Sequence, residues 1–303
     1  MMNLFMLLNK FPLLLSVFGI DKWLKDGQIE AITNNIQKIQ EMSGNVLTKA
    51  GQQLGETPQS FNAGVFSILE KITNNILVPV GILILSCLMF YELIDLMLQK
   101  NRADEPIDYK YIIKWLFKIV LGVVILSNSW TIVNGIMGFC QYIISSVSNL
   151  VSGEINESTV TSLDAFAQQL ESYSTWKLVW FSVLTFTANL FNYIYTLIVP
   201  IFVFLRIFEI YLLLSASPIP MSSFMNEKFS AMGVNYLKRI LAKGLQAVFM
   251  LIVLAMGAGL QSQLLSANAG EIGTAIGNIF IGNIVLLIML AKTGGVANAI
   301  MGI

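Results

Sequence analysis

The sequence predicts an all-α, polytopic helical membrane protein with about five crossings, a broken or re-entrant helix, and an N-terminal amphipathic helical region. Composition is the first observation behind this prediction. Apolar residues make up 55% of the 303 residues and charged residues only 12%, against roughly a quarter charged in ordinary soluble proteins. The second observation is that the apolar residues gather in uncharged runs of about 20 residues, the length that a helix needs to cross ~30 Å of hydrocarbon. A soluble fold of this length could not bury so much apolar surface.

The residue types that are missing bear on function. Histidine is absent, and the two cysteines, Cys87 and Cys140, both lie in apolar stretches. This excludes histidine-dependent catalytic triads, histidine-ligated zinc and imidazole proton relays. No glycine-rich phosphate loop of the Walker type occurs, and 18 basic residues balance 18 acidic ones. We therefore expect a protein that is not an enzyme, with no catalytic residue, no metal site and no cofactor.

Residues 1–72 form a region of mixed polarity, which we expect to lie outside the cell or on the membrane, apart from a transmembrane helical domain of residues 73–303. Its first 20 residues are apolar but carry Lys10 at their middle, which fits a membrane-lying or partly inserted segment. Four isoleucines then recur at three- and four-residue steps, which indicates an amphipathic helix: Ile29, Ile32, Ile36 and Ile39. This stripe either packs against the protein's own spans or binds a partner or lipid headgroups. Gly51, Gly55 and Pro58 should end the helix, and Ser60 is placed to cap a second one.

Six uncharged or nearly uncharged segments are candidates for crossing the membrane. They are residues 73–98, 119–143, 176–199, 201–215, 245–265 and 272–291. The second lies in an uncharged run longer than one crossing needs, so we expect it to tilt or bend. The candidate bend points are Asn128, Asn134, Gly135 and Gly138. Pro200 separates the third segment from the fourth, and Lys292 closes the sixth.

The basic residues give an orientation. They cluster in two predicted loops, one holding Lys100, Arg102 and Lys110 and the other Lys228, Lys238, Arg239 and Lys243. Because basic loops stay in the cytosol, we expect both loops inside and the acidic stretch between residues 144 and 176 outside. Six crossings would put the second basic loop outside. One crossing over residues 176–215, broken at Pro200, removes this conflict and leaves five, with residues 21–72 outside.

Polar groups in the fourth segment are candidates for lining or gating a conduit. Arg206 and Glu209 stand three residues apart, so on a helix they share a face and can pair. Charged residues inside a membrane usually face a bundle interior or water; the alternative is a pair near the interface with Arg206 reaching out to the headgroups. Pro218 and Pro220 cannot continue the helix, and the residues before them favour extended backbone. This corner is either a cytosolic turn or a re-entrant element at a passage.

Small and amide residues mark contacts between helices in the last two spans. The candidates are Gly257, Gly259, Gly273, Gly277, Asn278 and Asn283. Glycines let helix backbones approach closely, and amides can hydrogen-bond across the contact. The contact is either within one chain or between identical subunits.

The order of these features resembles a known family. An amphipathic region precedes two spans, an acidic outer loop, a helix pair that begins with tryptophan, the Ala-Ser-Pro-Ile-Pro corner of residues 216–220, a basic inner loop and glycine-rich last spans. Over residues 60–303 the chain resembles the TrbL-like polytopic inner-membrane subunit of conjugative type IV secretion systems, in its Gram-positive mobile-element form. The resemblance implies a homo-oligomeric channel component in the bacterial plasma membrane. It implies as partners the membrane lipid, other secretion-channel subunits, separate ATPases, and single-stranded DNA with its relaxase, which would pass transiently.

Two other classes stay open at this point. The chain could be the permease subunit of a small-molecule transporter of the ABC type, in which residues 221–240 would supply the short cytosolic helix that couples to the ATPase. It could also be a membrane scaffold that transports nothing.

Overall fold

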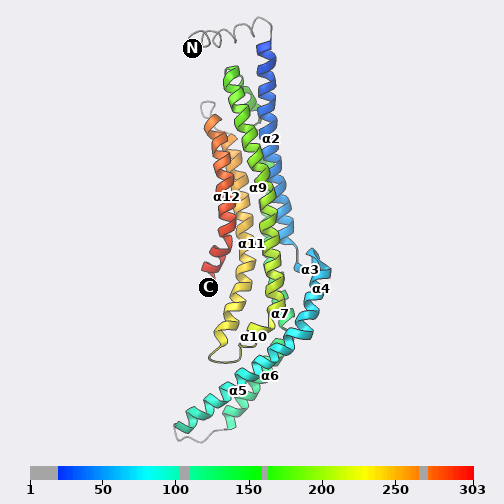
Figure 1. Ribbon diagram of the computed structural model, residues 1–303, viewed down its shortest axis with the longest axis vertical. Coiled ribbons are helices and arrows are strands. Elements are labelled where there is room, and N and C mark those ends of the chain that lie inside the picture. Colours follow the sequence, from blue (N-terminus) through cyan, green and yellow to red (C-terminus); the bar gives the residue numbers. More distant parts are fainter. Residues whose placement is uncertain (1–19, 103–108, 159–162, 266–271) are drawn as a thin grey trace, which may run out of the picture. The chain divides into compact units, whose positions relative to one another are not determined.

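The computed structural model describes residues 20–102, 109–158, 163–265 and 272–303, and all regular structure in these ranges is helical (Figure 1). The prediction of an all-α polytopic protein is therefore confirmed. In chain order the elements are α2 (Ile20–Gly55), α3 (Pro58–Phe61), α4 (Ala63–Ile72), the π-helical η1 (Thr73–Leu77), α5 (Val78–Arg102), α6 (Tyr109–Ser127), α7 (Ser129–Ser158), α8 (Leu163–Leu170), α9 (Thr175–Ala216), α10 (Pro218–Met221), α11 (Ser230–Leu265) and α12 (Ile272–Ile300). The prediction that residues 1–20 lie on the membrane falls almost entirely outside the described residues.

Several helices are long and apolar enough to cross a membrane. Within the described ranges four qualify: Ala63–Asn101, Thr175–Ala216, Ser230–Gly257 and Phe280–Ile300. Helices α6 and α7 qualify only together, as a pair bent by 61° that forms either a broken fifth span or a re-entrant loop. The bend falls at Asn128, one of the predicted bend points, where the side-chain amide donates to the Val124 carbonyl at 2.8 Å. The other three bend points lie inside the continuous helix α7.

Two expected helix ends are wrong. Pro200 does not break the span, because it lies inside the continuous 42-residue helix α9, and packed neighbours let a membrane helix tolerate a missing hydrogen bond. Lys292 does not close the last span, because α12 runs on to Ile300. An exposed lysine can extend away from a helix without interrupting its backbone. The helix stops instead at Gly302, whose φ of 67° lies in the left-handed region that suits glycine.

The chain divides into two compact units. The first comprises Met1–Ala50, Ser148–Ile201 and Leu251–Ala291, and the second comprises Gly51–Val147, Phe202–Met250 and Lys292–Ile303. The predicted boundary at residue 72 concerns membrane insertion and stays a prediction.

The core of the first unit forms where α2 meets α8 and α9. Ile32, Ile36 and Ile39 are almost fully buried, as the isoleucine stripe predicts. They pack with Phe166 and Leu170 of α8 and with Leu178 and Ala188 of α9. The stripe therefore packs inside the chain, which was the first of its two interpretations.

The start of the second unit is organised by two N-caps. Thr57 caps α3 and forms a capping box with Ser60, and Asn62 caps α4 by accepting from the Val65 amide at 3.0 Å. The expectation that Ser60 is itself a cap is wrong, because Pro58 takes the first helical position and leaves the cap to the residue before it. Helices α5 and α6 follow as a hairpin whose helices lie side by side (Figure 1).

Candidate functional site at the connection between α10 and α11

The predicted Pro-x-Pro corner is a buried, one-turn helix in the second unit. Ser217 adopts helical backbone angles (φ −52°, ψ −37°), and Pro218–Met221 form α10. The extended backbone expected before Pro218 is therefore wrong, because proline is well suited to the first position of a helix, where no backbone hydrogen is needed. Helix α10 packs against η1, α5 and α6, and Ser217 and Pro218 are buried while Pro220 is half-buried.

Asn226 anchors the connection that follows α10. Its side-chain amide donates to the Leu88 carbonyl of α5 at 2.8 Å. Its Oδ1 accepts from the backbone amides of Lys228 and Phe229 at 3.0 and 3.2 Å. The side chain is 1% exposed, so these bonds satisfy a buried amide and fix the entry to α11. Sequence reasoning missed Asn226, although asparagine is a residue that turns favour for this local bonding.

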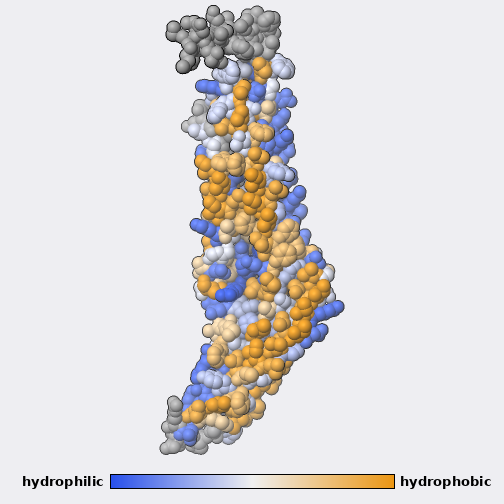
Figure 2. All heavy atoms as spheres, in the orientation of Figure 1, coloured by the Kyte–Doolittle hydropathy of each residue, from blue (hydrophilic) through white to orange (hydrophobic). Residues whose placement is uncertain are grey.

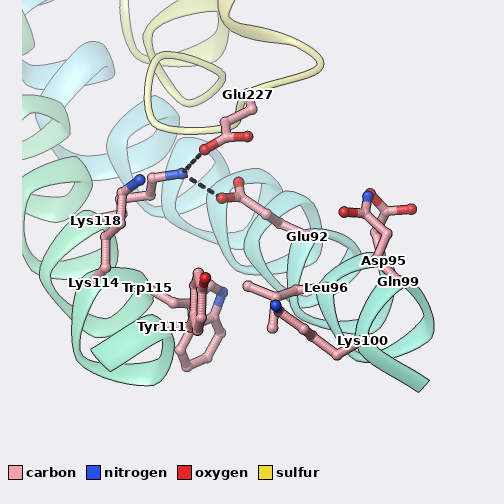
Figure 3. Close-up of a pocket in the computed structure, with 10 residues that line it drawn as sticks. All are labelled: Glu92, Asp95, Leu96, Gln99, Lys100, Tyr111, Lys114, Trp115, Lys118 and Glu227. Atoms are coloured by element: carbon pink, nitrogen blue, oxygen red, sulfur yellow. Dashed lines mark hydrogen bonds and ion pairs between the residues drawn. The ribbon is translucent and has the colours of Figure 1, made fainter. Parts of the chain in front are cut away.

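A charged pocket lies beside this connection, between the facing ends of α5 and α6 (Figure 3). Lys118 of α6 donates to Glu92 of α5 at 2.5 Å and to Glu227 of the connection at 2.8 Å. The pocket encloses about 290 Å³, and its lining includes the aromatic side chains of Tyr111 and Trp115. Trp115 also donates its indole hydrogen to the Met89 carbonyl at 2.9 Å.

A third ion pair joins the same connection to α5. Lys228 lies 2.9 Å from Asp95 of α5 and faces the ring of Tyr91. Its hydrogen bonds with Asp95 and Tyr91 raise the pKa of Lys228, and the hydrogen bond from Lys118 lowers the pKa of Glu227. Both shifts favour the charged forms, so at neutral pH the two pairs hold the connection against α5 and α6. We call these three ion pairs, Lys118–Glu92, Lys118–Glu227 and Lys228–Asp95, together with Asn226, the clamp.

The contacts of the clamp are ion pairs and hydrogen bonds. Glu92 keeps one oxygen, Oε2, buried without a hydrogen-bond partner in the described residues. No three histidine, cysteine, aspartate or glutamate side chains within the described ranges gather closely enough to hold a metal ion.

Replacing Lys118 by methionine should open the clamp. The change leaves Glu92 without its cation in a largely buried position, while Glu227 is 72% exposed and loses little. We expect a loss of about 2 kcal/mol, between the ~1 kcal/mol or less of an exposed pair and the ~3–5 kcal/mol of a fully buried one. Thermal unfolding of the purified protein in detergent measures this.

Lys114→Met is the matched control for Lys118→Met, because Lys114 lies one turn away and lines the same pocket but forms no ion pair among the described residues. The part of the stabilisation that comes from Glu227 has a defined pH dependence. Since its folded pKa is lowered, this stabilisation is present above the unfolded pKa and disappears as the pH falls through the folded pKa. The difference between wild type and Lys118→Met should therefore narrow in acid. Equal stability of the two methionine variants at neutral pH would contradict the clamp.

The predicted pair of Arg206 and Glu209 takes a different form. Glu209 forms its ion pair with Lys243 of α11 rather than with Arg206. Arg206 is 3% exposed and donates from Nε to the Lys243 carbonyl at 3.1 Å. Its Nη2 is buried without a hydrogen-bond partner in the described residues. The guanidinium therefore sits inside the packed second unit instead of reaching out to the headgroups.

A cavity of about 410 Å³ adjoins Glu209 and Lys243. Leu212 and Leu213 of α9 line it together with Arg239 of α11 and Asn298 of α12. Arg206 does not line this cavity, so of the two predicted charges only Glu209 borders open space there. A role for either residue in a conduit stays a proposal.

Most of the predicted loop cations lie on helices. Lys238, Arg239 and Lys243 belong to α11, which begins at Ser230, so the expected loop over these residues is wrong. Lys100 and Arg102 end α5 and Lys110 begins α6, which leaves Lys228 in a connection. The sequence prediction placed the start of this helix too late because the first turns of α11 are polar, and hydropathy does not recognise polar turns as part of a span.

Two of the predicted packing residues make contacts within the first unit. A Cβ added at Gly257 would lie 2.5 Å from Leu286 of α12, and the buried Asn283 of α12 donates to Asn192 of α9 at 3.2 Å. Added Cβ atoms at Gly259 and Gly277 would meet no atom within 4 Å. Asn278 is exposed on α12, and Gly273 lies in the first turn of that helix. Packing between subunits stays a proposal for these positions.

Comparison with known families now decides the classification. The family model described as TrbL/VirB6 plasmid conjugal transfer like protein matches residues 44–218, more than half of the chain. The chain belongs to this family. The match confirms the resemblance that the sequence suggested, and no curated protein matches the chain. The TrbL/VirB6 match runs from the end of α2 to the start of α10, so it includes Arg206 and Glu209 but not Glu227 or Lys243.

TrbL/VirB6 membership places the chain in the machinery of conjugal transfer. Together with the candidate spans, it makes the chain a multi-pass membrane protein. Of the two cysteines of this TrbL/VirB6 protein, Cys140 is buried, whereas Cys87 is exposed on α5. Because α5 belongs to a candidate span, a thiol exposed on its surface can still lie in an apolar environment, that of the surrounding lipid.

Proposed function

We propose that this protein is a non-enzymatic channel or scaffold subunit of a conjugative type IV secretion machine in the bacterial plasma membrane. The observation that carries the proposal is the TrbL/VirB6 match over residues 44–218, a stretch that contains three of the candidate spans. In this function single-stranded DNA with its attached relaxase passes through an assembly of identical subunits and other channel proteins. Separate ATPases supply the energy.

The charge distribution supports passage rather than tight binding. A protein that holds single-stranded DNA needs a cationic groove with aromatic side chains on which the bases stack. The chain has no net charge, and lysines of its second unit are engaged with carboxylates, as Lys118, Lys228 and Lys243 are. A polyanion would therefore meet a polar wall instead of a high-affinity site.

The permease alternative gains no support from the family match. It also required a short coupling helix over residues 221–240. These residues form the end of α10, an irregular connection and the first turns of the 36-residue helix α11. The expectation of a separate coupling helix over these residues is therefore wrong. We retain the conjugation function.

Deletion of the gene should abolish transfer of the mobile element from donor cells, and a copy supplied in trans should restore it. Mating assays measure the transfer frequency. Nicking at the transfer origin should persist in the deletion strain, because a channel subunit acts after the relaxase has processed the DNA. Normal transfer from the deletion strain would refute the proposal, and loss of nicking would assign the protein to DNA processing instead.

A further inference from the structure

The outward face of α2 is polar over most of its length. From residue 26 on, exposed polar and charged residues recur every three or four residues, with adjacent pairs at 37–38 and 48–49: Asp26, Glu30, Asn34, Gln37, Lys38, Glu41, Asn45, Thr48 and Lys49. This spacing puts them on one side of the helix. Among the described residues of α2, Trp23 is the only large apolar side chain that is exposed, and it lies near the start of the helix. We call these nine residues the polar face.

Buried amides fix where α2 lies along α9. Asn192 of α9 accepts from Ser43 of α2 at 3.3 Å and donates to the Ile39 carbonyl at 3.3 Å. The same Asn192 oxygen accepts from Asn283 of α12 at 3.2 Å. The three helices therefore meet at one level of the first unit, and the middle of the polar face lies at this level.

At that level α9 and α12 expose large apolar side chains. Leu190 and Ile194 of α9 are 54% and 41% exposed, and Ile281 and Ile284 of α12 are 57% and 42% exposed. They belong to the candidate spans Thr175–Ala216 and Phe280–Ile300. Figure 2 shows the apolar surface of these helices beside hydrophilic residues along the edge formed by α2. Such apolar surface is the kind that faces lipid.

The polar face cannot face the same lipid. A lysine or carboxylate costs about 2.5–3.5 kcal/mol at the centre of a bilayer, and Lys38 and Glu41 stand at the level of the apolar surface. At 1.5 Å per residue the polar face is roughly 35 Å long, about the thickness of the hydrocarbon core. Its length and its position both fit a helix that crosses beside the spans with water on its outer side.

We propose that the polar face of α2 lines an aqueous passage at the depth of the spans. The inference rests on the proposed function, and it adds the wall of the passage to it. It also places α2 beside the spans rather than outside the membrane. The face carries three carboxylates and two lysines, so it repels a polyanion weakly and offers no cationic track to hold it.

Cysteine reactivity tests the proposal in donor cells that carry the complete apparatus. In a background with Cys87→Ser and Cys140→Ala, single cysteines replace Gln37 or Asn45 on the polar face and Leu190 or Ile194 on the apolar surface as matched controls. The probe is a charged methanethiosulfonate. We expect cysteines at 37 and 45 to react at least about tenfold faster than those at 190 and 194, because a thiol ionises in water and not in hydrocarbon. A bulky reagent at 37 or 45 should also lower transfer.

Each of the other outcomes contradicts a specific part of this proposal or of the proposed function. Equal reactivity at all four positions would put this level outside the hydrocarbon, and protection at 37 and 45 would show that protein covers the polar face. Suppose that gene deletion abolishes transfer and that cysteines at 37 and 45 are labelled fast, but that the bulky reagent leaves transfer unchanged. The proposal that α2 lines the passage would then be refuted, and the proposed function would stand. Normal transfer after gene deletion would instead end the proposed function, and the labelling pattern would still report whether α2 meets water.

Discussion

A Gly244→Ala substitution should sharply lower the amount of folded protein in the membrane. Gly244 of α11 faces Cys140 of α7, and a Cβ added there would lie 2.7 Å from the Cys140 Cβ and closer still to its sulfur. Because a Cβ is fixed to the backbone, the two helices would have to separate. Overpacking of this kind costs about 1–3 kcal/mol or more, a large share of the ~5–15 kcal/mol that stabilises a typical protein. Membrane abundance and thermal unfolding in detergent measure the effect.

Gly259→Ala is the control for Gly244→Ala, since it lies on the same helix and an added Cβ there meets no atom within 4 Å. We expect normal abundance for it, because alanine favours helices over glycine by up to ~1 kcal/mol. Cys140→Gly should partly rescue Gly244→Ala by removing the opposing side chain. Equal abundance of the two alanine variants would show that α7 and α11 do not approach at Gly244.

The spans were the most predictable part of the fold. Crossing a membrane demands about 20 apolar residues whatever the rest of the chain does, so hydropathy alone locates them. The bend at Asn128 was predictable for a related reason. The uncharged run there is too long for one crossing, and asparagine can bond its own backbone in place of the helix.

The ends of the helices were less predictable, because charge marks the edge of the hydrocarbon and not the end of a helix. Lys292 lies well inside α12, and Lys238 and Lys243 lie inside α11. The predicted break at Pro200 failed for a similar reason, because the local cost of its missing backbone hydrogen bond is offset by tertiary packing. A helix ends where its backbone finds other partners, and this depends on the surroundings.

The candidate site was predicted only where its contacts are local. Arg206 and Glu209 were found because they stand three residues apart, but the ion-pair partner of Glu209 is Lys243, 34 residues further along the chain. The approach of Gly244 to Cys140 and the bonds of Asn192 join distant segments as well. One sequence carries no signal for such pairs, whereas the isoleucine stripe of α2 was visible because a helix repeats it.

Asn192→Leu should loosen α2 from α9. The substitution removes the acceptor of Ser43 and of Asn283 and the donor to the Ile39 carbonyl. Each buried group left without a partner costs about 1–3 kcal/mol in soluble proteins, although bonds between membrane helices average nearer ~0.6 kcal/mol. The two bonds that join α2 to Asn192 are both lost, so we expect a lower unfolding temperature and faster hydrogen exchange in α2.

Asn189→Leu is the comparison for Asn192→Leu, because Asn189 lies one turn earlier, is half-buried and makes a long 3.4 Å bond to Asn35. It should change exchange in α2 far less. The isoleucine core of α2 is untouched in both variants, so α2 should stay helical and docked in the control. If both variants exchange like wild type, the isoleucine stripe alone holds α2 in place. In that case the buried amides only set its register, and the polar face would keep its position without them.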